Sequence, residues 1–139
     1  MNVRPWNRDG AYHALVHELE VGWAPVIGPS SLIVWRRANS LFLSRSSQGF
    51  DTAVDAELLG AMVGLRGTTR KGTNIVKSLR RLSDFGLASI EGDDVYVAVH
   101  ADLPSPRLRA RTWPSELEEW AAGLPSPVGV RIAPTRRPA

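Results

Sequence analysis

The sequence predicts a mainly helical domain with a small β-hairpin and a C-terminal extension. Apolar residues recur at helical spacing in the segments before residue 86. Two short alternating segments then flank a turn, and proline and arginine accumulate after residue 102. The chain has 139 residues, enough for one ordinary domain. We expect an N-terminal segment at 1–28, the domain at 29–102 and the extension at 103–139.

The composition favours a folded soluble protein. Hydrophobic residues make up 43% of the chain and charged residues 22%, which argues against disorder. Because cysteine is absent, disulfides, thiolate metal sites and cysteine nucleophiles are excluded. No apolar run of about eighteen residues predicts a membrane span, and the first ten residues are too polar for a signal peptide. The expected location is the cytoplasm, in association with the nucleoid.

The N-terminal third contains one strong helix. The first ten residues look irregular, and residues 11–20 favour a helix that Pro25, Gly28 and Pro29 then interrupt. The segment 29–47 predicts a helix with proline in its first turn. Its apolar residues cover most of its circumference: Leu32, Ile33, Val34, Trp35, Ala38, Leu41, Phe42 and Leu43. Such a helix is either central to the domain or partly buried against another subunit, and we expect a homodimer.

The middle of the chain predicts two more helices and a hairpin. After a short extended piece at 52–54, Asp55 is a plausible N-cap for a helix over 56–65. The predicted core stripe of that helix is Leu58, Leu59, Met62 and Val63. A helix over 73–85 is closed by Gly86. Residues 87–100 alternate around the turn Glu91–Asp94 and predict a hairpin.

The C-terminal extension predicts mostly irregular structure. Residues 103–114 are rich in proline and basic, so we expect an extended segment in which Arg107, Arg109 and Arg111 point one way. This segment is either a basic arm that follows DNA or a solvated linker. Ser115 and Glu118 have capping-box spacing and predict one short helix, followed by a loosely ordered tail. Trp113 and Trp120 are expected to pack on the domain, with a dimer or partner contact as alternatives.

The stretch VKSLRRLSDFGLASIEGDDVYVAV carries a family resemblance. It resembles the third helix and wing of winged helix-turn-helix regulators, in which a helix ending Leu-x-x-Leu-x-x-aromatic-Gly-Leu runs into the first wing strand. The residues concerned are Leu79, Leu82, Phe85, Gly86 and Leu87. The resemblance covers about half of the chain, from Pro29 to Val99. The whole chain is also similar to uncharacterised actinobacterial proteins with a glycine-rich basic loop before this helix.

The resemblance implies that residues 73–85 form a recognition helix for duplex DNA. With Ile75, Leu79, Leu82 and Phe85 directed inward, the opposite face carries side chains that can bind base edges or phosphates. The predicted DNA-binding residues are Arg66, Thr69, Arg70, Lys71, Thr73, Asn74, Lys77, Ser78 and Arg81. Base reading is expected from Asn74, Lys77 and Arg81. The alternative is an ordinary solvated face of a packed helix.

Two features depart from the resemblance. The segment RGTTRKG is longer than the usual turn between the two helices, and it predicts a basic flap along the DNA backbone. The wing tip carries Glu91, Asp93 and Asp94, which would repel phosphates. We therefore expect the helix to read DNA and the wing to stay outside the groove.

Other motifs give no stronger hypothesis. GTTRKGT does not match a phosphate-binding loop, because the residue after Gly72 is Thr73 where that loop has lysine. His13, His17 and Glu18 superficially fit a metal site on one helix face, but the third ligand has no candidate at suitable spacing except His100 or an acid. We predict no metal, no cofactor, no membrane association and no enzyme activity.

The sequence favours one function and leaves two alternatives open. The favoured function is sequence-specific binding of double-stranded DNA, as a transcriptional regulator that reads the major groove. One alternative is a winged-helix module for protein interaction, with the C-terminal extension as the contact. The other is a DNA-binding accessory factor in plasmid or phage replication, partition or excision.

Overall fold

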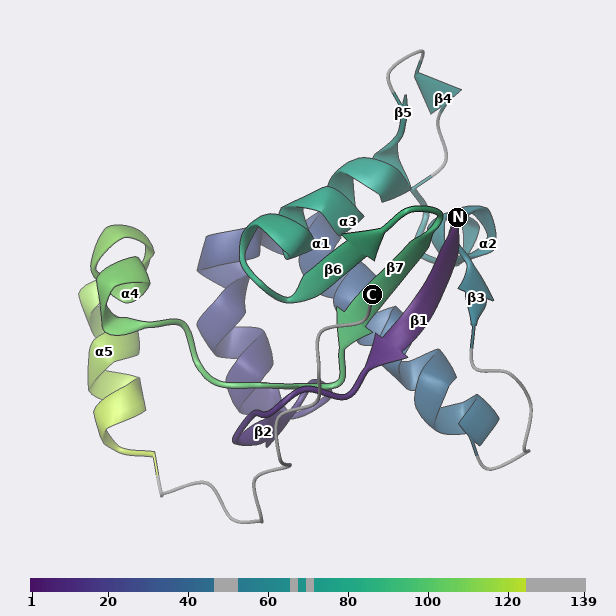
Figure 1. The fold of residues 1–139 in the computed structure, drawn as a ribbon. Coiled ribbons are helices and arrows are strands. Elements are labelled where there is room, and N and C mark those ends of the chain that lie inside the picture. Colours follow the sequence, from purple (N-terminus) through teal and green to yellow (C-terminus); the bar gives the residue numbers. More distant parts are fainter. Residues whose placement is uncertain (47–52, 66–67, 70–71, 125–139) are drawn as a thin grey trace.

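The fold is mainly helical with a small β-sheet, as predicted (Figure 1). The computed structural model describes residues 1–46, 53–65, 68–69 and 72–124. In chain order its elements are β1 (Asn2–Trp6), β2 (Tyr12–His13), α1 (His17–Ser46), β3 (Val54–Asp55), α2 (Ala56–Met62), β4 (Thr68–Thr69), β5 (Gly72–Thr73), α3 (Asn74–Asp84), β6 (Ala88–Glu91), β7 (Asp94–Ala98), β8 (His100–Ala101), α4 (Pro106–Thr112) and α5 (Ser115–Ala122). None of the helices in these ranges is long and apolar enough to cross a membrane.

The N-terminal strand β1 lies inside the main sheet. The strand order is β3-β1-β7-β6, with β1 antiparallel to β3 and parallel to β7. Val3 is fully buried and faces Val54 on one side and Val95 on the other. The prediction of an irregular N-terminus is therefore wrong. A five-residue strand containing a proline gives little local signal, and its partners lie far away in the sequence.

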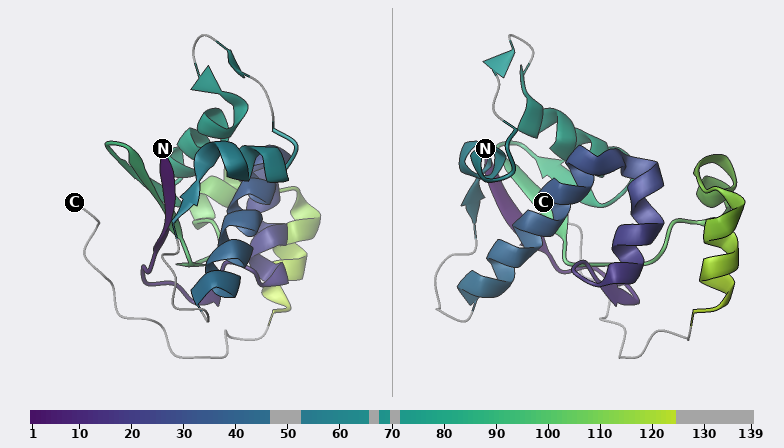
Figure 2. Two further views of the ribbon diagram at one scale, coloured as in Figure 1. Left: turned by 90° about the vertical axis from the view of Figure 1, so that its right-hand side faces the viewer. Right: turned by 180° about the vertical axis from the view of Figure 1, so that it is seen from behind.

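Helix α1 is divided into two halves at Gly28. The backbone of Gly28 has φ 80 and ψ 168, which is outside the helical region. This confirms the predicted interruption at Gly28, but Pro25 lies within the first half, which continues past the predicted end near residue 20. The first half begins at His17 rather than near residue 11, because Tyr12 and His13 form β2 and pair with β8. The two halves differ in direction behind the sheet (Figure 2).

The second half of α1 is central to the domain. Val34, Trp35, Ala38 and Phe42 are buried in the core beneath the sheet. The Trp35 Nε1–H and the Asn39 amide both donate to the Ala98 carbonyl, at 2.9 and 3.0 Å. These two bonds fix the helix to the end of β7. Most of the apolar surface that suggested a dimer is thus used within the chain, although Ile33 and Leu43 remain exposed.

The predicted cap, the predicted helix over 73–85 and the hairpin are confirmed, with one error in the core. The Leu58 N–H donates to the Asp55 carboxylate at 3.1 Å, so Asp55 caps α2. Helix α3 is followed by Gly86 with φ 77, and β6 and β7 form the hairpin. In α2, Leu59 is buried, but Leu58 and Met62 are each 45% exposed. A helix of seven residues packs along one narrow edge, so the predicted stripe is too wide.

The C-terminal extension is docked on α1. Residues expected to be extended form α4, because the Ser105 hydroxyl accepts from the Leu108 N–H and Pro106 occupies the first turn. Trp113 is buried and its Nε1–H donates to the Gly22 carbonyl at 2.7 Å. The short helix α5 is confirmed, but Ser115 is its first residue and no side chain caps it. The predicted tail after residue 124 lies outside the described residues.

Candidate nucleic-acid interface

Helix α3 is held rigidly by its buried side. Ile75, Leu79 and Leu82 are almost completely buried, and the helix packs against α1, α2 and β6. Phe85, the fourth residue predicted to point inward, is partly buried at the end of the helix. Eleven residues give a helix about 16 Å long. One side of α3 is therefore fixed by the core, and the other is available on the surface.

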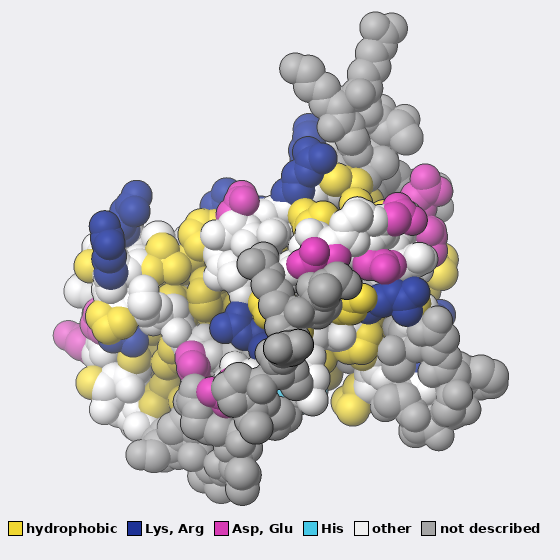
Figure 3. Space-filling model, in the orientation of Figure 1, with side chains coloured by type: hydrophobic (Ala, Val, Ile, Leu, Met, Phe, Trp, Pro, Cys, Tyr) yellow, Lys and Arg dark blue, Asp and Glu magenta, His cyan; other side chains and the backbone are white. Residues whose placement is uncertain are grey.

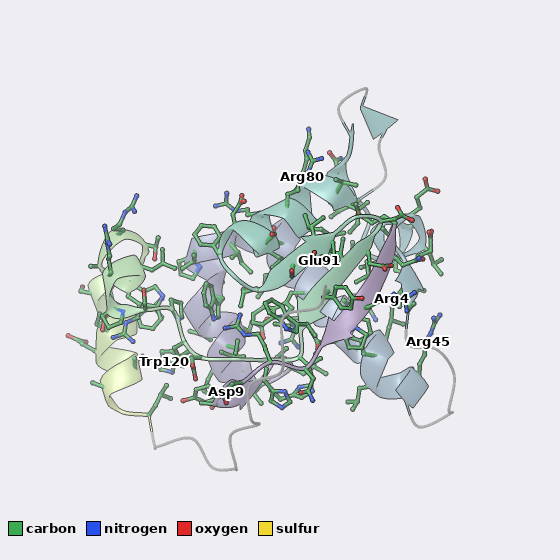
Figure 4. All side chains as sticks on the ribbon, viewed as in Figure 1. Arg4, Asp9, Arg45, Arg80, Glu91 and Trp120 are labelled. Atoms are coloured by element: carbon green, nitrogen blue, oxygen red, sulfur yellow. The ribbon has the colours of Figure 1, made fainter. Side chains whose placement is uncertain are left out.

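The outward side of α3 carries amide and cationic groups. The exposed residues of the helix are Asn74, Lys77, Arg80, Arg81 and Asp84. Two of the predicted base-reading residues, Asn74 and Lys77, are therefore exposed as expected. Arg80 also projects from this side (Figure 4), although the sequence analysis did not assign it to the site. Its spacing of three from Lys77 and six from Asn74 is the signal that could have identified it.

Ser78 does not belong to the outward side. It is 7% exposed, and its carbonyl accepts from the hydroxyl of the buried Ser31 on α1 at 3.2 Å. Ser78 therefore does not lie on the outward face that was predicted to contact DNA. Starting from Ile75, the helical spacing i, i+3, i+4, i+7 includes residue 78 together with Leu79 and Leu82. A small polar side chain at that position lets α1 approach closely.

Arg81 is exposed but attached to the fold. Its Nε–H donates to the Ile27 carbonyl at 2.8 Å and its Nη2–H to the Val26 carbonyl at 3.0 Å. Both carbonyls end the first half of α1, where Gly28 interrupts the helical hydrogen bonds. The guanidinium also lies 5.5 Å from the centre of the Phe85 ring. Arg81 thus caps α1 from another helix, a role that the sequence analysis missed because it had assigned the residue to base reading.

A short strand pair leads directly into α3. Thr68 pairs with Thr73 and Thr69 with Gly72, so β4 and β5 are antiparallel. The pair projects beyond the N-terminal end of α3 (Figures 1 and 2). The predicted residues Thr69 and Thr73 lie in these strands, and α3 begins one residue later than predicted. The predicted residues Arg66, Arg70 and Lys71 lie outside the described residues.

The acidic turn of the β6–β7 hairpin has a structural use. The Met1 amino group lies 3.3 Å from the Asp93 carboxylate, and the Arg4 Nε lies 3.2 Å from that of Asp94. The Glu91 carboxylate accepts from the Ser89 hydroxyl at 3.0 Å. Two of these three carboxylates therefore help to bind the N-terminal segment to the hairpin.

The histidines do not share a helix face. His13 lies in β2 and His17 is the first residue of α1, so the two do not form the pair on one helix face that the sequence suggested. His13 instead meets His100 edge to face, with ring centres 5.3 Å apart. Burial lowers the pKa of both rings, and His13 lowers that of His100 further. Within the described ranges, no group of three or more His, Asp or Glu residues could hold a metal ion.

The predicted basic arm is a helix, and its three arginines lie in different surroundings. Arg109 is half-buried, lies 3.3 Å from the Glu118 carboxylate and packs over the Trp113 ring. Arg107 and Arg111 are exposed. The three side chains therefore do not point one way. Trp113 and Trp120 lie 6.4 Å apart by ring centres, with Trp113 buried in the protein's own fold, which fits the packing prediction.

Comparison with protein-family models, curated proteins and solved structures finds no match to this chain.

Proposed function

We propose that the protein binds double-stranded DNA through a winged helix-turn-helix domain and acts as a transcriptional regulator. In this proposal α3 is the recognition helix and the β6–β7 hairpin is the wing. The observation that carries it is the row formed by Asn74, Lys77 and Arg80 on the exposed side of α3. A row of donors on a helix that is fixed by its other side suits a major groove about 12 Å wide.

The charges along α3 support contact with a polyanion. Lys77, Arg80 and Arg81 are basic, and the helix carries no acidic residue before Asp84 at its last position. Dark blue side chains rise from this part of the surface in Figure 3. Such a single-signed surface attracts phosphates, and the exposed amide of Asn74 can bind adenine in a bidentate manner. We assign base reading to Asn74 with Lys77 or Arg80, and the capping of α1 to Arg81.

The test is fluorescence anisotropy with a random-sequence duplex across a salt series. The logarithm of the binding constant should fall with the logarithm of salt at a slope of about −4 to −6. Lys77→Ala combined with Arg80→Ala should reduce the steepness by about 1, since each phosphate contact contributes about 0.9 and one of these two residues is assigned to base reading. Absence of binding at low salt would overturn the proposal.

Arg37→Ala serves as the control for the loss of a positive charge outside α3. Arg37 is exposed on α1 and lines a hollow with Leu15, Ile33 and Ser40, and none of the lining residues belongs to α3. Its removal lowers the net charge without touching the proposed interface, so the salt slope should remain that of the unaltered chain. The mass of each variant in solution is measured alongside, so that a change of oligomeric state is not mistaken for a lost DNA contact.

Sequence specificity needs a separate measurement. After selection of a preferred duplex, Asn74→Ala should reduce the ratio of specific to random binding and leave the salt slope unchanged. A base contact carries sequence information, whereas a phosphate contact carries the salt dependence. An unchanged ratio would remove Asn74 from base reading.

A homodimer is part of the proposal. Ile33 and Leu43 on α1 are 46% and 59% exposed, which leaves apolar surface for a second copy. Two recognition helices would then meet successive major grooves about 34 Å apart. Elution at the mass of one chain at micromolar concentration would contradict the dimer.

A further inference from the structure

Helix α4 exposes two arginines to solvent. Arg107 and Arg111 are four residues apart, so they project from the same side of the helix, and both are exposed. Arg109 lies on another side and pairs with Glu118 of α5. The helix therefore separates a structural arginine from two that face solvent.

The position of α4 is fixed relative to α3. Trp113, directly after α4, donates to the Gly22 carbonyl, and the Trp23 Nε1–H donates at 2.9 Å to the carbonyl of Asp102, four residues before α4 begins. A Cβ on Gly22 would lie 2.8 Å from the Leu103 side chain, so the contact is close. Arg81 of α3 holds the end of the same half of α1 through the Val26 and Ile27 carbonyls. The first half of α1 is thus a rigid bridge between α3 and α4.

The charges of the C-terminal helices are segregated. Helix α4 contains three arginines and no acid, whereas α5 contains Glu116, Glu118 and Glu119 and no base. In Figure 3 the basic side chains over α4, at the left, rise on the same side of the molecule as those over α3. Acidic side chains at that end lie lower, over α5. The basic side of the helix pair therefore continues the basic side of α3.

We infer that Arg107 and Arg111 bind backbone phosphates of the same duplex whose major groove receives α3. This inference rests on the proposed function and extends the interface from one helix to two. A guanidinium binds phosphate through paired N–H donors and positions the protein without reading sequence. The exposed carboxylate of Asp84 at the end of α3 opposes this attraction, so two arginines on α4 also offset an acid in the interface.

The experiment compares Arg107→Ala combined with Arg111→Ala against the unaltered chain and Arg37→Ala, in the salt series described above. The double variant should bind with a slope smaller by about 2 and with an affinity at 0.1 M salt lower on the order of tenfold to a hundredfold. Arg107→Lys combined with Arg111→Lys keeps both charges and should retain the slope. Both arginines are exposed, so the thermal midpoint of either double variant should match that of the unaltered chain.

The outcomes separate the two proposals. If the unaltered chain binds and the alanine double variant has the same slope as Arg37→Ala, the α4 contact is overturned and the α3 proposal stands. If the unaltered chain does not bind DNA at low salt, both are overturned. A smaller slope in the alanine double variant alone, with the slope retained in the lysine double variant and in Arg37→Ala, supports the second contact.

Discussion

Arg81 illustrates how a single exposed side chain can stabilise a helix to which it does not belong. The break at Gly28 leaves carbonyl groups at the end of the first half of α1 without helical partners. The Arg81 guanidinium donates to two of them, at 2.8 and 3.0 Å. The residue therefore connects the break in α1 to the position of α3.

The first prediction compares two adjacent arginines. Arg81→Ala should lower the free energy of unfolding by about 1–2 kcal/mol, because hydrogen bonds from a charged donor are lost and water replaces them only in part. Arg80→Ala should leave stability within about 0.5 kcal/mol, since Arg80 is exposed and projects outward. Chemical denaturation of both variants measures the difference. Equal denaturation midpoints for the two variants would contradict the capping of α1 by Arg81.

The histidine pair predicts a dependence of stability on pH. Burial lowers the pKa of His13 and His100 below the ordinary value of 6.5, so the folded protein favours neutral rings. The Leu15 N–H donates to His13 Nδ1 at 3.1 Å, which also requires the unprotonated nitrogen. As the pH falls below about 6.5, the unfolded chain takes up protons before the folded chain, so the free energy of unfolding decreases. Above that pH this contribution is fully present.

Thermal midpoints between pH 5 and pH 8 measure this effect. With His13→Gln combined with His100→Gln, the thermal midpoint should fall less steeply as the pH drops below 6.5. His17→Gln is the control, because His17 is exposed at the start of α1, and it should keep the decline of the unaltered chain. A double variant with an undiminished decline would assign the acid sensitivity to other groups.

At the scale of elements, α2 and α3 differ in how much of their apolar surface is used. Helix α3 buries Leu79 and Leu82 completely, whereas α2 buries Leu59 and exposes Leu58 and Met62. Both helices have apolar residues at helical spacing in the sequence. The difference arises because α3 crosses α1 and β6, whereas the seven-residue α2 contacts its neighbours along one edge.

A pair of identical substitutions tests this difference. Leu82→Ala should cost about 2–5 kcal/mol, because it opens a cavity in the core. Leu58→Ala should cost less than about 1 kcal/mol, since its side chain is 45% exposed. Urea denaturation of both variants gives the two values. A large loss for Leu58→Ala would indicate that this face of α2 is covered, as it would be in a dimer.

At the scale of the whole molecule, the predicted domain boundaries omit parts that complete the core. Residues 29–102 lack β1, which lies between β3 and β7, and the first half of α1, which bears Leu19, Trp23 and Ile27 in the core. They also lack Trp113, which docks on Gly22. The N-terminal segment and the start of the extension thus pack as one body with the domain.

A fragment comparison tests this unity. The isolated segment 29–102 should fail to fold, because β3 and β7 would lose the strand that joins them and the sheet would expose an edge. The segment 1–124 should fold like the full chain, since it retains every described element. Amide dispersion in NMR spectra distinguishes the two. A dispersed spectrum for 29–102 would restore the predicted boundaries.

Local chemistry in the sequence determined much of the middle of the fold. Asp55 before an apolar run fixed the start of α2, Gly86 fixed the end of α3, and alternation around Gly92 fixed the hairpin. These features depend on capping groups and turn conformations within a few residues, so they are readable from sequence. The exposed positions of Asn74 and Lys77 followed from the same helical spacing.

Only the tertiary structure decided the parts that depend on distant partners. Strand β1 exists because β3 and β7 supply its hydrogen bonds. The acids of the β6–β7 turn were expected only to repel phosphates, whereas Asp93 and Asp94 pair with Met1 and Arg4. Ser78 is buried because α1 crosses there, and Arg81 bonds to α1 because Gly28 breaks that helix. The pairing of groups far apart along the chain is set by packing and register, which no local pattern encodes.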